Sequence, residues 1–379
     1  MDRILNIQAD PIENVFPFPQ FDFRRHNSYT LGMHTEVIII GAGPIGLEAA
    51  SVLKRNNMDY LQFDAGQIGH TFLKWPRNTL FYSSPEWIAI AGIPIHTPEQ
   101  FRITGEQYLA YLRQVAEVLD LHVHTYERVV DISGSKGNFT VSTEKRGERA
   151  AYRCSSIILA TGGLDRPRTL NLPGEDLPHV SHFFDLPHRY FRQRLLIVGG
   201  RNSAVEAAIR SWRAGANVTL SYRDHELSKE KVLDRLHLEI SLLIEKQQIR
   251  FLPNTEPVRF SSSTAVLSTS EGFESEIETD FVYMATGFEQ DQSLLRNAGI
   301  QLMEPENTPS YVRQTMQTNV PGIYIAGTAV GGSQREFSEF ITTGHIHSAR
   351  ILTALTSKGS AVTGNLPGRN YSLTPEDIE

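Results

Sequence analysis

Short apolar runs alternate with amphipathic stretches along most of this chain. A run of roughly four to eight aliphatic, often β-branched residues between turn residues is typical of a strand buried on both faces of a parallel sheet. The pattern predicts strands at 36–40, 60–63, 195–198 and 217–221, and three more that end in small residues at Gly162, Gly287 and Gly327. Helices are predicted over 47–53, 205–212 and about 336–355. An amphipathic stretch at 232–244 is expected to pack against the core. Strands that alternate with helices favour a doubly wound α/β architecture.

The first predicted strand runs directly into the glycine turn Gly41-Ala-Gly-Pro-Ile-Gly46, which opens a helix. In such a turn Gly41 makes the tight bend, Gly43 lets the backbone approach a pyrophosphate, and Gly46 allows close helix packing. The pyrophosphate then lies at the helix N-terminus, where free N–H groups favour an anion. Asp64 ends the next strand 18 residues after Gly46, where a ribose-binding carboxylate is expected. This unit therefore predicts a dinucleotide site.

A second unit of the same kind begins at Gly199-Gly-Arg-Asn-Ser-Ala204. Its fingerprint is weaker, because Arg201 stands where the middle glycine belongs. The following strand ends before Arg223 instead of an acid. An arginine at this place suits the 2′-phosphate of NADP, whereas an acid suits the free ribose hydroxyl of NAD. We therefore expect NADPH to bind here, with NADH left open.

Two glycine turns and three strands that end in small residues predict two nested Rossmann-like domains, the second interrupting the first. Small residues at strand ends let the backbone pass close to a bound cofactor. A nicotinamide needs a hydride acceptor nearby, and FAD is the acceptor expected in the first domain. Pro- and Gly-rich stretches at 166–178 and 287–299 mark the crossings. The predicted division is an irregular extension at 1–32, an FAD-binding domain at 33–165 and 288–379, and an NAD(P)H-binding domain at 166–287. Whether the native protein contains the extension stays open.

Composition narrows the functional classes. Lys and Arg number 36 and Asp and Glu 43, a net charge of −7, which disfavours binding to nucleic acid. No apolar stretch reaches the length of a membrane span, and the first 32 residues have no apolar core of a secretory signal. The 13 histidines show no metal-ligand spacing, so no metal is expected. We expect a cytoplasmic protein without a membrane partner.

The order of these motifs resembles that of the thioredoxin-reductase-like flavoproteins, and more closely that of the YpdA family of bacillithiol disulfide reductases. The residues that carry the resemblance are Trp75-Pro-Arg-Asn-Thr-Leu-Phe-Tyr-Ser-Ser-Pro-Glu86, Ala91-Gly-Ile-Pro-Ile95, Gly200-Arg-Asn-Ser-Ala204, Val218-Thr-Leu-Ser-Tyr-Arg223, Ile323-Tyr-Ile-Ala-Gly327 and Phe340-Ile-Thr-Thr-Gly344. The likeness covers about residues 35–355. It implies a homo-oligomeric oxidoreductase that passes hydride from NADPH to FAD and then to a small disulfide or another small acceptor.

Carried over position by position, the resemblance also implies cofactor contacts. Those to FAD are Gly41, Gly43, Pro44, Gly46, Asp64, Val129, Thr161, Gly162, Gly327 and Thr328. Those to NADPH are Gly199, Asn202, Ser203 and Arg223. Relatives usually have an acid after the late glycine, and here Thr328 stands there, so a hydroxyl or backbone contact must replace the carboxylate.

The chain departs from the family in its thiols. Members of the YpdA family carry a cysteine in the first glycine turn, where this chain has Ile45, and thioredoxin reductases carry a CxxC, which this chain lacks. Its single cysteine, Cys154, is expected to be an inert residue beside a strand. Because a thiolate is the nucleophile of disulfide exchange, the catalytic residues stay unknown. A flavin monooxygenase that uses oxygen, and a redox-sensing partner protein without turnover, remain alternatives.

Overall fold

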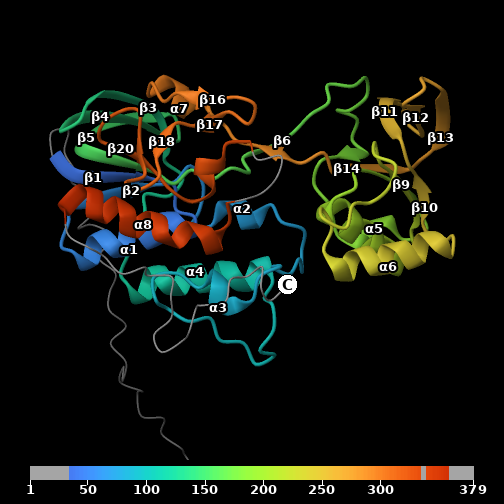
Figure 1. Ribbon diagram of the computed structural model, residues 1–379, viewed down its shortest axis with the longest axis horizontal. Coiled ribbons are helices and arrows are strands. Elements are labelled where there is room, and N and C mark those ends of the chain that lie inside the picture. The colour runs from blue at the N-terminus through green and yellow to red at the C-terminus, as the bar shows by residue number, and fades with distance from the viewer. Residues whose placement is uncertain (1–33, 334–338, 358–379) are drawn as a thin grey trace, which may run out of the picture.

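The structure is a computed structural model that describes residues 34–333 and 339–357. They form two lobes joined by a narrow connection (Figure 1). The predicted extension at 1–32 and positions 336–338 of the last predicted helix lie outside the described residues. No helix within the described ranges is long and apolar enough to cross a membrane.

The first lobe is built on an eight-stranded sheet that combines early and late parts of the chain. Its main path is β18-β19-β20-β5-β1-β2, and β4 and β3 extend it from β5. The strands are β1 (His34–Ile40), β2 (Tyr60–Phe63), β3 (Arg128–Ser135), β4 (Asn138–Lys145), β5 (Glu148–Leu159), β18 (Tyr311–Val312), β19 (Gln317–Thr318) and β20 (Ile323–Ile325). In the parallel part, Ile40 pairs with Phe63 and Leu159, and Leu159 pairs with Ile325. The carboxyl ends of β1, β2, β5 and β20 therefore meet at one edge.

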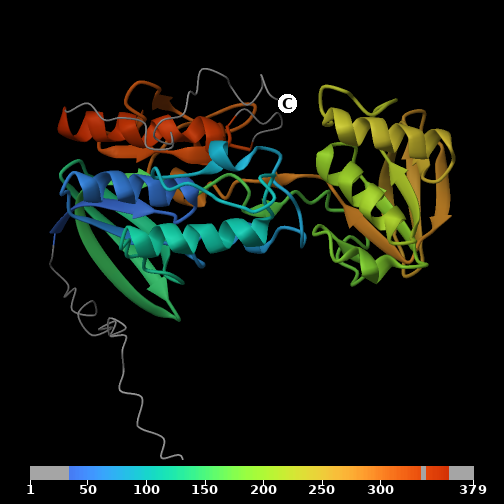
Figure 2. The ribbon, with the colours of Figure 1, turned by 90° about the horizontal axis from the view of Figure 1, so that it is seen from below.

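Helices cover this sheet and close a continuous apolar core. They are α1 (Pro44–Arg55), α2 (His70–Leu73), α3 (Pro85–Ile88), α4 (Gly105–Val118), α7 (Ser293–Asn297), the 3-10 helix η2 (Gly327–Gly331) and α8 (Ile341–Thr356). Helices α1 and α8 lie side by side, although almost 300 residues separate them (Figures 1 and 2). Buried Leu47 and Leu53 of α1 and Ile351 of α8 join the same core as the strands.

The second lobe holds a five-stranded sheet of order β10-β9-β8-β14-β7 and a separate three-stranded sheet. The strands are β7 (Val180–Ser181), β8 (Arg194–Val198), β9 (Asn217–Ser221), β10 (Arg250–Leu252), β14 (Phe281–Met284), β11 (Thr255–Phe260), β12 (Thr264–Thr269) and β13 (Glu274–Glu278). The helices are η1 (Pro187–Tyr190), α5 (Asn202–Arg213) and α6 (Asp234–Glu245). Alternate side chains of β8 enter different cores. Leu195 and Ile197 pack with α5 and α6, whereas Leu196 and Val198 pack with β11 and β12.

The two chain crossings between the lobes lie next to each other. Strand β6 (Arg166–Pro167) pairs antiparallel with β15 (Phe288–Glu289), and Arg166 and Glu289 form an ion pair at 2.8 Å. A further short pair, β16 (Leu302–Met303) with β17 (Thr308–Pro309), follows in the first lobe. This arrangement supports the predicted division at 165/166 and 287/288, which stays a prediction.

Observed helices differ from the expected ones mainly at their first residues. Helix α1 begins at Pro44 and α5 at Asn202, each three residues earlier than predicted, because both helices start inside their glycine turns. Helix α8 begins at Ile341, so extending it back to 336 was wrong at positions 339–340. Phe340 there is extended, and its N–H donates to the Thr343 hydroxyl at 3.0 Å, which sets the first turn.

Candidate functional site

The first glycine turn has the shape that a phosphate group needs. A Cβ on Gly41 would lie 2.2 Å from the Ala160 carbonyl oxygen, so only glycine fits between β1 and the end of β5. A Cβ on Gly43, by contrast, would meet no atom within 4 Å. No side chain caps α1, whereas the Thr104 and Gln107 side chains close a capping box at α4. The first N–H groups of α1, behind Pro44, are thus left for another acceptor.

Asp64 lies beside this turn, as predicted from the sequence. One of its carboxylate oxygens accepts the Ala42 N–H at 2.7 Å, and the other accepts the Gly66 N–H at 2.7 Å. A carboxylate has about four acceptor positions, so capacity remains for ribose hydroxyls. Val129 is brought to the same end of the sheet, because the Glu127 N–H donates to the Asp64 carbonyl at 2.9 Å.

The ends of β5 and β20 also converge. A Cβ on Gly162 would lie 3.9 Å from the Thr328 hydroxyl oxygen, which places the Ala-Thr-Gly end directly beside η2. The Thr161 hydroxyl is buried and has no hydrogen-bond partner. A buried hydroxyl without a partner costs free energy, which makes Thr161 a candidate for a ligand contact.

Ile45 lies between α1, η2 and α8. A Cβ on Gly344 would come within 2.9 Å of Ile45, and one on Gly327 within 3.2 Å, so both glycines make room for this side chain. Ile45 is only 6% exposed. At the position of the family's cysteine, this chain therefore has a packed aliphatic side chain.

Two histidines of α8 hold the site together, and sequence reasoning missed their role. His345 contacts the Glu48 carboxylate through Nδ1 at 2.8 Å and the Trp87 carbonyl through Nε2 at 3.1 Å. A carboxylate and a carbonyl both accept hydrogen bonds, so this arrangement favours the doubly protonated, charged imidazole. Burial by itself lowers the pKa of His345, but Glu48 and the Trp87 carbonyl outweigh burial and raise that pKa above its ordinary value.

His347 has the opposite character. Its Nδ1 accepts the N–H of Gly327 at 3.1 Å, which requires an unprotonated nitrogen. Burial, reinforced by Arg350 and Arg313, lowers the pKa of His347 to about 4. In the sequence, only the position of His345 and His347 next to Gly344 in one predicted helix marked these residues. Their partners, Glu48 and Gly327, lie elsewhere in the chain, so the sequence did not reveal the contacts.

Gln290 was also missed. It is 2% exposed, and its amide nitrogen donates to the carbonyls of Gly162 at 3.0 Å and Ala329 at 3.2 Å. It therefore joins the end of β5 to η2 from the second chain crossing. Nothing in the local sequence distinguishes this glutamine from a surface one.

The second turn repeats the geometry of the first. Gly199 approaches the Ala285 carbonyl, and Arg201 and Gly43 both occupy the N-cap positions of their helices, α5 and α1. No side chain caps α5 either. The Asn202 side-chain oxygen accepts the Leu233 N–H at 2.9 Å, so that side chain fixes the segment before α6.

The other two residues predicted at the second turn are open to solvent. Ser203 is exposed in the first turn of α5. The Arg223 side chain is 63% exposed at the end of β9, with the nearest Asp224 oxygen at 3.9 Å. Both are thus accessible to a ligand lying over the turn.

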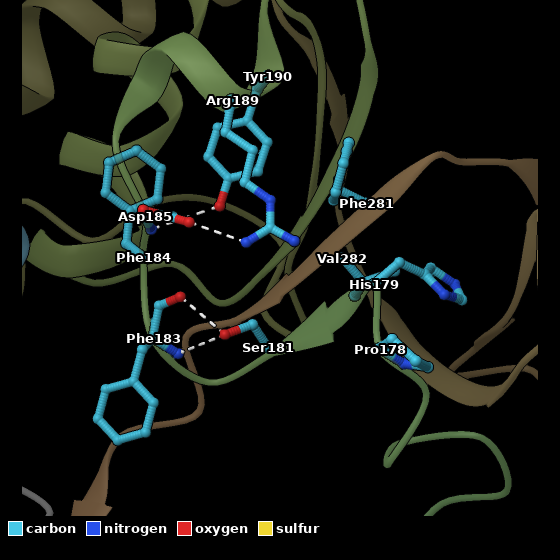
Figure 3. Close-up of a pocket in the computed structure, with 10 residues that line it drawn as sticks. All are labelled: Pro178, His179, Ser181, Phe183, Phe184, Asp185, Arg189, Tyr190, Phe281 and Val282. Atoms are coloured by element: carbon cyan, nitrogen blue, oxygen red, sulfur yellow. Dashed lines mark hydrogen bonds and ion pairs between the residues drawn. The ribbon is translucent and has the colours of Figure 1, made fainter.

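A cavity of about 210 Å³ lies in the second lobe, and no residue of either glycine turn lines it (Figure 3). Its lining includes the ion pair of Asp185 and Arg189 and the rings of Phe184, Tyr190 and Phe281. None of the residues predicted for either cofactor lines it.

Cys154 is fully buried in β5, and burial raises the pKa of its thiol to about 12. The thiolate therefore scarcely forms near neutral pH, as the inert assignment requires. Among the described residues there is also no group of three or more His, Cys, Asp or Glu side chains that could hold a metal ion.

Glycine turns that open helices at the carboxyl edges of two separate sheets are typical of α/β proteins that bind two dinucleotides. Comparison with known proteins agrees. Residues 38–327 match the model of the family described as pyridine nucleotide-disulphide oxidoreductase. The chain is 31% identical over 325 residues to bacilliredoxin reductase Bdr of Bacillus subtilis, which is 85% of this chain and 98% of that protein.

Solved structures give the same result. The bacillithiol disulfide reductase Bdr (YpdA) of Bacillus cereus matches with a TM-score of 0.81 at 32% identity, over 86% of this chain and 99% of that one. Lactococcus lactis thioredoxin reductase matches with a TM-score of 0.66 at 22% identity, over 85% and 98%, which shows the shared fold. The chain belongs to the pyridine nucleotide-disulphide oxidoreductase family and within it to the Bdr (YpdA) group. It is a flavin-dependent enzyme that uses FAD and NAD(P)H, as the resemblance implied.

Proposed function

We propose that this enzyme takes hydride from NADPH and delivers two electrons to a small disulfide such as bacillithiol disulfide. FAD, when bound, links the two half-reactions by accepting hydride and releasing electrons. The balanced reaction is NADPH + H⁺ + RSSR → NADP⁺ + 2 RSH. The observation that carries the proposal is the similarity to Bdr over almost the whole of that protein. The two glycine turns, where no side chain caps the helix that follows, agree with it.

We assign the FAD contacts to the first turn and the sheet edge around it. The α1 N-terminus would hold the pyrophosphate, Asp64 the ribose, and Val129 the adenine side. The unpaired Thr161 hydroxyl, Gly162, Gly327 and Thr328 would lie against the opposite end of the cofactor. The space beside Gly43 supports the first of these assignments.

We assign NADPH to the second turn, with Gly199, Asn202 and Ser203 at the pyrophosphate and Arg223 at the 2′-phosphate. An Arg223→Ala variant should raise the KM for NADPH by about 10-fold or more, since a charge-assisted contact to phosphate is lost. The KM for NADH should hardly change, and initial rates with the two nucleotides measure both. Equal losses with both nucleotides would contradict the assignment.

The acceptor reaction must proceed without a protein thiol. Ile45 carries no nucleophile, and the only cysteine, Cys154, is buried. No mixed disulfide with the enzyme can therefore form at the site, and a bound flavin would have to supply the electrons to a disulfide without a protein thiol as relay.

An anaerobic experiment tests this acceptor. The enzyme is reduced with one equivalent of NADPH, bacillithiol disulfide is added, and flavin absorbance is followed. Prompt return of the oxidised spectrum with release of two thiols per disulfide is expected. A flavin that stays reduced until oxygen, a quinone or a protein is added would contradict the disulfide assignment and indicate one of those acceptors.

We also propose that the enzyme acts in the cytoplasm as a homo-oligomer, as the family resemblance implies. Light scattering during size-exclusion chromatography of the FAD-loaded protein tests the second point, and a monomer mass would contradict it.

A further inference from the structure

The segment from Trp75 to Glu86, which carries much of the family resemblance, makes a contact between the lobes. Here it is called the bridging loop. The Arg210 guanidinium of α5 donates to the Thr79 hydroxyl at 3.1 Å and to the Arg77 carbonyl. The Tyr82 side chain also interacts with Glu206, one turn earlier in α5. A loop of the first lobe thus contacts the helix that begins at the second glycine turn.

The bridging loop is firmly anchored on its own lobe. Phe81 packs against the rings of Trp75 and Tyr108, with centroids 4.7 Å apart in both pairs. The Phe81 N–H donates to the Ile103 carbonyl at 2.9 Å, and the Thr79 carbonyl accepts the Gly105 N–H at 3.1 Å. Thr79 and Tyr82 therefore present their hydroxyls from a fixed backbone.

The contact surface on α5 is equally well fixed. Glu206 and Arg210 are 3.6 Å apart, and their side chains are 20% and 18% exposed. Arg210 also lies over the Phe184 ring, 5.5 Å from its centroid, at the edge of the cavity in Figure 3. Burial raises the pKa of Glu206, which Arg210 and Tyr82 partly offset. Removing one partner would leave a polar group poorly satisfied, so the network favours one arrangement of the lobes.

This contact lies close to the second turn. Glu206 is four residues after Asn202, about 6 Å along the helix axis at 1.5 Å per residue. Moving α5 relative to the bridging loop would therefore move the start of the helix, and the nicotinamide with it, relative to the flavin site. Hydride transfer is sensitive to such shifts, since a misplacement of about 1 Å can cost about 100-fold in rate.

We infer that Tyr82 and Thr79 are positioning residues for hydride transfer, which hold the nicotinamide-binding helix in register with the flavin-binding lobe. The inference rests on the proposed binding of the nicotinamide nucleotide at the second turn. It gives the bridging loop a role in the reductive half-reaction that is separate from the choice of acceptor.

The test uses anaerobic stopped-flow reduction of the FAD-loaded enzyme, with the nucleotide that reduces the wild type and no acceptor present. Tyr82→Phe and Thr79→Val should each lower the limiting rate of flavin reduction by about 10-fold, while the nucleotide Kd changes by less than about twofold. Thr79→Ser keeps the hydroxyl and should restore most of the rate.

Matched controls remove similar hydrogen bonds elsewhere. Tyr152→Phe deletes a tyrosine–glutamate bond to Glu127 within the first sheet, and Thr353→Val deletes a hydroxyl contact on α8. In both control variants the flavin should be reduced at the wild-type rate. Limiting rates that are unchanged or faster in Tyr82→Phe and Thr79→Val would overturn the inference, because the contact would then be irrelevant or would restrain a resting arrangement. Reoxidation by disulfide is measured separately on the wild type, so failure of the proposed acceptor is distinguishable.

Discussion

Ile45 shows how one residue changes what the site can do without changing its fold. Its side chain fills the space left by Gly344 and Gly327, so the first turn, η2 and α8 still pack closely. The position that carries a thiol in the YpdA family here contributes only packing. This side chain supplies no group that could take part in thiol chemistry.

This packing gives a first prediction. Alanine usually stabilises a helix relative to glycine by about 1 kcal/mol, but Gly344→Ala should destabilise by about 1–3 kcal/mol because its methyl would crowd Ile45. Combining it with Ile45→Ala should cost less than the sum of the two single changes. Urea unfolding of the four proteins measures this coupling. Strict additivity would show that the two side chains do not compete for space.

The two histidines of α8 give a second prediction: their contributions to folding stability change with pH in opposite directions. Because the pKa of His345 is raised in the folded protein, the protonated ring stabilises the fold. This stabilisation is complete below about pH 6.5, the pKa of histidine in the unfolded chain, and is lost as pH rises through the pKa in the folded state. The pKa of His347, lowered to about 4, means that its contribution is present above about 6.5 and is lost as pH falls toward 4.

Substitution separates these contributions. His345→Gln should destabilise most at low pH, and His347→Gln most at neutral pH, relative to the wild type. Chemical unfolding between about pH 5 and 8 measures both differences. Parallel curves for the two variants would contradict the assigned protonation states.

At the scale of elements, the two glycine turns were predicted in full, and the strands 60–63, 195–198 and 217–221 occur within one residue of the expected bounds. Apolar runs are a reliable signal there because most residues of these strands are buried. The exact helix starts depended on cap geometry. The short strands β16 to β19 could not be predicted, because they contain two residues each.

The first turn yields a third prediction, which separates folding from binding. Gly43→Ala should cost the apoprotein no more than about 1 kcal/mol, since a methyl meets no atom there, but should weaken FAD binding by more than about 10-fold. Gly41→Ala should destabilise the apoprotein by more than about 2 kcal/mol, since its methyl would clash with Ala160 at a left-handed φ of 109°. Apoprotein unfolding and quenching of FAD fluorescence report the two effects. A Gly43→Ala protein with normal FAD affinity would disprove the pyrophosphate assignment.

At the scale of the whole molecule, the apolar residues form separate cores in the two lobes. We therefore predict two transitions in scanning calorimetry of the apoprotein. FAD should raise chiefly the transition of the first lobe and NADP⁺ that of the second, because a ligand stabilises the unit that binds it by about 4 kcal/mol at 1,000 times its Kd. A single transition raised equally by either ligand would show that the lobes unfold together.

The sequence by itself determined both glycine turns, the strands and helices next to them, and Asp64 at the end of its strand. These features depend on local periodicity and on short spacings, which a chain displays directly. Only the tertiary structure decided which distant residues meet: Glu48 with His345, Ile45 with Gly344, and Thr79 with Arg210. Each pair is more than 100 residues apart, so its contact depends on how the sheets and lobes pack, and no local pattern records it.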